Sequence, residues 1–103
     1  MSQNEGTANS LFLKSYVEIK LDRLDEAKAH LLQVIDMKSD YHEAYYNLSL
    51  ICLEEENFAK AKEYAEQAVE NQPSNEDYQK LLNQIMDLES AASGLQLPRS
   101  IID

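Results

Sequence analysis

The sequence predicts an all-α fold built from repeated pairs of helices. The 103-residue chain holds only two glycines and two prolines, which argues against a turn-rich β protein and for long helices. The segment 23–40, "RLDEAKAHLLQVIDMKSD", aligns with the segment 57–74, "NFAKAKEYAEQAVENQPS", with the apolar positions in phase at helical spacing. A period of about 34 residues is typical of proteins that stack helix–turn–helix units.

Composition and charge narrow the class of partner. The chain carries 19 acidic and 9 basic residues, for a net charge of −10, and this balance repels phosphate backbones and anionic membranes. The first ten residues, MSQNEGTANS, lack the layout of a signal peptide, and the longest near-apolar run, residues 48–53, is too short to span a bilayer. We expect a soluble, cytoplasmic protein with no nucleic-acid or membrane partner.

The segment 42–75 spans one full period and carries a recognisable pattern. Its first half holds Tyr45, Leu48, Ser49 and Cys52 on one helical face, and its second half holds Phe58, Ala61, Ala65, Ala68 and then Pro73. In this order and spacing the segment resembles one tetratricopeptide repeat. It departs from the family pattern at Glu56, where the turn usually carries glycine, and at Ala65, where a larger residue is common.

The resemblance implies a fragment of a right-handed α-solenoid with two helix–turn–helix repeats, residues 8–41 and 42–75, and a C-terminal capping helix over residues 75–90. Residues 1–7 are expected to be disordered. The tail, residues 91–103, is expected to be extended or disordered, although its leucines and isoleucines leave open that it docks in cis or on another copy.

Residues with capping chemistry mark the expected helix ends. Asp40 with Glu43 has the spacing of a capping box, and Asn57 can cap the helix that follows it. Pro73 cannot continue a helix and so ends the fourth one, after which Ser74 or Asn75 caps the fifth.

The first repeat fits the pattern less well than the second. Its first helix places Lys14 and Glu18 where the family has apolar residues. Two interpretations stay open: the helix is rotated or slipped, or one side of it is unusually polar.

The residues that carry chemistry do not form a catalytic pattern. The two histidines, His30 and His42, lack a metal-ligand spacing, and the single cysteine, Cys52, falls on the expected core face without an activating base. We therefore expect no enzyme, no metal and no cofactor. The acidic run 54–56 is interpreted as a solvated rim, and the alternative is an acidic lip that selects a basic partner.

A second apolar strip remains after the packing face is assigned. In tetratricopeptide repeats the first helix of each repeat lines a concave surface where partners bind, so the resemblance implies a groove. The candidate partner-binding residues are Phe12, Tyr16, Ile19, Glu43, Tyr46, Asn47, Leu50 and Leu53. Alternatively, the tail, the fifth helix or a second copy covers this strip, or Phe12 and Tyr16 belong to the core of a slipped helix.

These residues predict a protein–protein interaction module. Asn47 matches one asparagine of the carboxylate clamp found in some family members, but the other clamp positions carry no Lys or Arg. We therefore expect an apolar or amphipathic helix or peptide as partner, and the acidic net charge favours a basic or neutral one. The alternatives are a self-assembling scaffold, since two repeats make a small core, and a chaperone or adaptor subunit of a larger complex.

Overall fold

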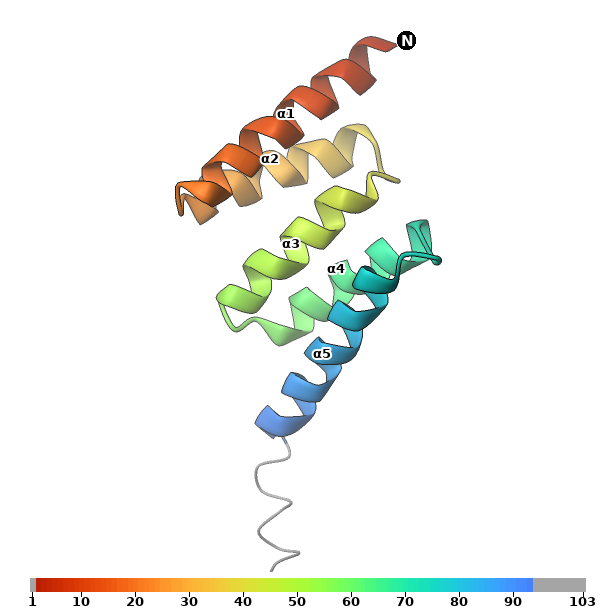
Figure 1. The fold of residues 1–103 in the computed structure, drawn as a ribbon. Helices are drawn as coiled ribbons and strands as arrows, with labels where there is room; N and C mark the ends of the chain where they lie inside the picture. The colour runs from red at the N-terminus through yellow and green to blue at the C-terminus, as the bar shows by residue number, and fades with distance from the viewer. Residues whose placement is uncertain (1, 94–103) are drawn as a thin grey trace, which may run out of the picture.

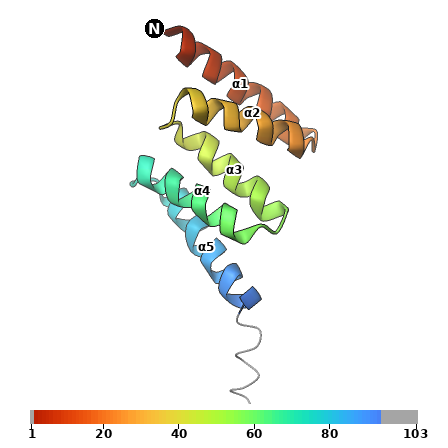
Figure 2. The same ribbon diagram turned by 180° about the vertical axis from the view of Figure 1, so that it is seen from behind.

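The computed structural model describes residues 2–93, which form five α-helices and no strand. They are α1 (Ser2–Lys20), α2 (Leu24–Met37), α3 (His42–Glu54), α4 (Phe58–Asn71) and α5 (Glu76–Ser93). Each helix packs mainly on its neighbours in the chain, so the helices stack in order from α1 to α5 (Figures 1 and 2). The predicted all-α helical-repeat fold is confirmed.

The two helix pairs have the same backbone geometry at equivalent positions of the repeat. The amide of Arg23 donates to the carbonyl of Glu18 at 2.7 Å, and the amide of Asn57 donates to that of Cys52 at 2.8 Å. The residues before these amides, Asp22 and Glu56, both have a φ of 61°. The first helix is therefore neither rotated nor slipped relative to the repeat.

The first helix of the first repeat instead has an unusually polar side, which is the second of the two interpretations left open by the sequence. Glu18 occupies the place of Cys52 and is buried, with its Oε1 2.7 Å from Nδ1 of His30. His30 in turn occupies the place of Tyr64, which packs against the cluster that contains Cys52. A polar contact between α1 and α2 thus replaces an apolar one between α3 and α4.

The predicted packing face of the second repeat is confirmed. Its four residues, Tyr45, Leu48, Ser49 and Cys52, are all buried. Three buried alanines of α4 let that helix approach α3 closely: Ala61, Ala65 and Ala68. The Ser49 hydroxyl donates to the carbonyl of Ala61 at 2.8 Å, which satisfies a buried polar group inside the pair.

The predicted side-chain caps agree with the structure except at α3. The Asn57 and Asn75 side chains accept hydrogen bonds from the amides three residues on, as caps of α4 and α5. The capping box at Asp40 and Glu43 is wrong, because the N-cap of α3 is Tyr41 and has no side-chain bond. The Asp40 carboxylate instead lies 3.2 Å from the Lys38 ammonium, which lowers the pKa of Asp40.

Residues 2–7, for which we expected disorder, are helical and form the first turns of α1. Ala8 immediately after them is fully buried in the first core cluster. At the other end α5 runs to Ser93. The rest of the expected tail, residues 94–103, lies outside the described residues.

The interface between successive repeats contains a Lys–Glu ion pair at equivalent positions. The Lys28 ammonium lies 2.7 Å from the Glu55 carboxylate, and the Lys62 ammonium lies 3.2 Å from that of Glu89. The helix α5 therefore docks on the second repeat as α3 docks on the first.

The positive φ at Glu56 predicts that glycine stabilises the chain there. A side chain in the left-handed region costs about 1–2 kcal/mol, partly offset by the greater freedom of unfolded glycine. The Glu56→Gly variant should have a free energy of unfolding about 1 kcal/mol above that of Glu56→Ala in urea titrations. The alanine variant is the control because it removes the same charge and keeps the strain, and equal stabilities would contradict the strain.

The Glu18–His30 contact predicts non-additive effects on stability. Replacing Glu18 by the second-repeat residue, Glu18→Cys, leaves His30 without its partner and should lower the free energy of unfolding by about 1–3 kcal/mol. His30→Tyr alone leaves the buried Glu18 carboxylate without its partner and should lower the free energy of unfolding by a similar amount. The double variant should lose less than the sum, because it recreates the second-repeat pair. Losses that add to within about 0.5 kcal/mol would rule out the coupling.

Candidate functional site

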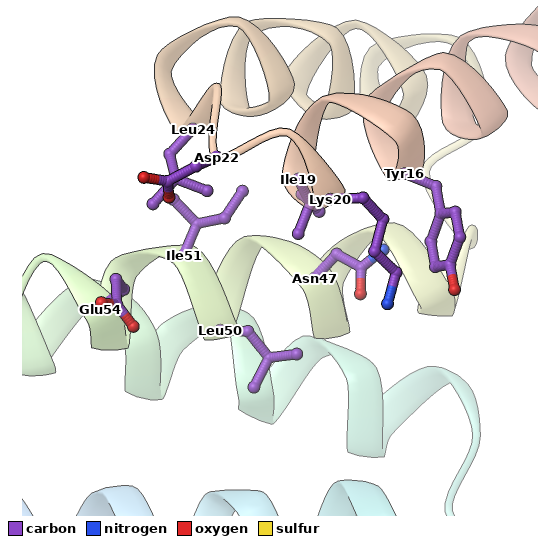
Figure 3. A pocket seen from close by; sticks show the side chains of 9 residues that line it. All are labelled: Tyr16, Ile19, Lys20, Asp22, Leu24, Asn47, Leu50, Ile51 and Glu54. Carbon is purple, nitrogen blue, oxygen red and sulfur yellow. The ribbon is translucent and has the colours of Figure 1, made fainter.

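A groove of about 400 Å³ lies between α1 and α3 (Figure 3). It is lined by Tyr16, Ile19, Lys20, Asp22, Leu24, Asn47, Leu50, Ile51 and Glu54. We call this hollow the α1–α3 groove.

The groove lies where α1 and α3, the first helices of the two repeats, pack more extensively on α2 than on each other. Both pack on α2, which holds them apart. Ile51 is almost completely buried and Ile19 is partly buried, so they form the floor. Tyr16 and Leu50 remain 48% and 39% exposed, and these two side chains therefore offer apolar surface to a ligand.

The two ends of the α1–α3 groove differ in charge. At one end the Lys20 ammonium lies 5.1 Å from the centre of the Tyr16 ring, over its face. The carboxylates of Asp22 and Glu54 lie toward the other end (Figure 3). The half-buried Asn47 lies at the lysine end, where its amide can both donate and accept a hydrogen bond.

Four of the eight candidate residues line this groove together: Tyr16, Ile19, Asn47 and Leu50. Phe12 does not, because its ring packs on that of Tyr41 at 5.1 Å between centroids and against the first core cluster. Glu43 lines a separate, smaller hollow with Asn9, Lys38, Asp40, Tyr41 and His42.

The remaining two candidates, Tyr46 and Leu53, pack toward α5. The Tyr46 ring lies 4.9 Å from that of Tyr78, and Leu53 packs against the cluster that contains Leu81. Tyr78 is itself buried, which raises its pKa to about 12, and its hydroxyl lies 2.7 Å from Nδ1 of His42. The fifth helix thus covers this part of the strip, which is one of the alternatives left open by the sequence.

Sequence reasoning missed five lining residues: Lys20, Asp22, Leu24, Ile51 and Glu54. Lys20 and Glu54 are 34 residues apart and so occupy equivalent positions of the two repeats. Adding the next pair of equivalent positions to the apolar strip would have identified both residues. Asp22 and Leu24 come from the turn and the start of α2, and the pattern of the first helices carries no signal for them.

No group of three potential metal ligands occurs within residues 2–93. Cys52 is buried, and burial raises the pKa of its thiol, which opposes formation of the nucleophilic thiolate. In the same part of the chain no helix is both long and apolar enough to cross a membrane.

Comparison with known proteins agrees with the geometry. A family model described as tetratricopeptide repeat matches residues 18–85, more than half of the chain. A comparison with curated proteins finds none that matches. The matched region includes both turns that have a positive φ. It also includes the whole Lys28–Glu55 bridge and Lys62, but not Glu89, the partner of Lys62. The chain belongs to the tetratricopeptide repeat family, whose repeats generally mediate protein–protein interactions.

Proposed function

We propose that this chain is a non-catalytic interaction module that holds an apolar segment of a partner protein in the α1–α3 groove. The observation that carries the proposal is the exposure of Tyr16 and Leu50 beside an apolar floor. When an apolar side chain of the partner inserts between Tyr16 and Leu50, it displaces water from their apolar surfaces, and this release favours binding.

The size and shape of the groove favour a few inserted side chains. Its volume of about 400 Å³ falls at the lower end of the range of ligand pockets. An extended peptide, or one edge of an amphipathic helix, presents anchors of this size.

The charged residues at the two ends of the α1–α3 groove favour one orientation of the bound segment. A basic residue of the partner fits beside Asp22 and Glu54, and an acidic one fits beside Lys20. The net charge of −10 also raises the rate of encounter with basic partners.

Selected peptides test the proposal. Peptides from a random displayed library, selected on the wild-type chain, should share an apolar anchor. Leu50→Glu and Tyr16→Ala should each raise their Kd at least about tenfold in calorimetric titrations, since both remove apolar contact surface. Neither side chain is part of the core, so circular dichroism should show unchanged folding.

Leu32→Glu is the matched control, since Leu32 is exposed on α2 and does not line the groove. It adds the same charge as Leu50→Glu and should leave the Kd unchanged. Equal affinity for the wild type and both groove variants would overturn the assignment of the groove.

A further inference from the structure

One side of α1 presents a row of exposed apolar side chains, formed by Leu13, Val17 and Leu21. They are 63%, 54% and 58% exposed, respectively, and they follow one another at a spacing of four residues along the helix. Among the large apolar side chains that the structure describes, these three are the most exposed. Adjacent exposed apolar side chains of this kind mark interaction surfaces. We call this row the α1 face.

The 34-residue register shows what kind of element packs on this face elsewhere in the chain. The equivalent face of α3 packs on α2, and that of α5 packs on α4. Ile51 and Ile85, the counterparts of Val17, are buried in clusters that also contain Leu31 of α2 and Ala65 of α4, respectively. The α1 face therefore lies at a position of the repeat that receives a helix.

The α1 face is more apolar than its counterparts at one end. Where α1 has Leu21, α3 and α5 have Glu55 and Glu89. These two carboxylates pair with Lys28 of α2 and Lys62 of α4. A helix of the same kind as α2 or α4 would place its lysine against Leu21, where no carboxylate meets it. The α1 face thus suits a helix that presents apolar surface at this point, unlike the second helices of this chain.

Two lysines flank the α1 face. On a helical projection Lys14 and Lys20 lie about 60° to either side of Val17, and both are exposed. The single acidic residue between positions 6 and 21, Glu18, is buried and pairs with His30 of α2. Although the whole chain carries a net charge of −10, this part of its surface is locally positive and favours acidic groups.

The same lysines disfavour a second copy of this face as the occupant. In an antiparallel pair of α1 helices centred on Val17, Lys14 of one copy would lie opposite Lys20 of the other. A parallel pair would bring each lysine near its own counterpart. Like charges placed together in this way oppose association, so the charges favour a different, acidic chain.

We propose that the α1 face binds an amphipathic helix of another protein, whose apolar ridge is flanked by acidic residues. The ridge packs on Leu13, Val17 and Leu21, and the flanking carboxylates lie near Lys14 and Lys20. The repeat interfaces within the chain combine the same two elements, an apolar helix contact and a Lys–Glu pair. The proposal does not rest on the function proposed for the α1–α3 groove, because Lys20 is the only one of these five residues that also lines the groove.

Two synthetic helices that differ only in their flanking charges test the proposal. Each is a stapled peptide of about five turns with the same stripe of leucines, flanked by glutamates in one peptide and by lysines in the other. In fluorescence anisotropy titrations the wild-type chain should bind the glutamate-flanked peptide with a Kd at least about tenfold lower than that of the lysine-flanked peptide. The net charge of −10 would by itself favour the lysine-flanked peptide, so the expected preference requires local positive charge at the binding site.

Single variants locate the binding site. Val17→Glu places a carboxylate on the apolar row and should raise the Kd of the glutamate-flanked peptide at least about tenfold. Lys14→Glu should remove most of the preference for that peptide, whereas Lys80→Glu, the same charge change on α5, should leave it unchanged. All three side chains are exposed, so circular dichroism should show unchanged folding.

Leu50→Glu separates this site from the groove, because it adds the same charge as Val17→Glu but within the groove lining. It should leave the Kd of the glutamate-flanked peptide unchanged. Equal or tighter binding of the lysine-flanked peptide, or no binding of either peptide by the wild type, would overturn the proposal. Binding that survives Val17→Glu would overturn it too, and binding abolished by Leu50→Glu would place the peptide in the groove instead.

Discussion

The structure depends on how closely the second helix of a repeat can approach the first. In the second repeat this approach rests on Ala61, Ala65 and Ala68, which are all buried and have almost no side chain to hold the helices apart. The 2.8 Å bond from Ser49 to the carbonyl of Ala61 is possible only at this separation. A larger residue at any of these alanines would push α4 away and displace α5, which docks on it.

The groove follows from the same constraint. Once each pair is closed, the next first helix packs on the second helix of the pair before it, as the Lys28–Glu55 and Lys62–Glu89 bridges show. Successive first helices are then separated by the width of the helix beneath them. Between α1 and α3 this separation is not filled by side chains, so Tyr16 and Leu50 face solvent. Further along, Tyr46 and Tyr78 are large enough to close the gap between α3 and α5.

The sequence was sufficient for the fold, and four of the eight candidate residues lie together in the α1–α3 groove. The packing face of Tyr45, Leu48, Ser49 and Cys52 could be predicted from helical spacing because the four residues lie on one side of α3 and are all buried. The spacing could not separate Tyr46 and Leu53 from Leu50, since all three lie on the side away from that face. Which of them is covered depends on aromatic and aliphatic residues much later in the chain, in α5. The Glu18–His30 contact was missed for a similar reason, because the polar position in α1 makes sense only with its partner in α2.

The most direct test of the groove is an amide chemical-shift map of the isotopically labelled chain during titration with a selected peptide. If the groove is the binding surface, the largest shifts fall in residues 16–24 and 47–54, and α4 changes little. Shifts concentrated on α4 or α5, with these two segments unaffected, would contradict the account.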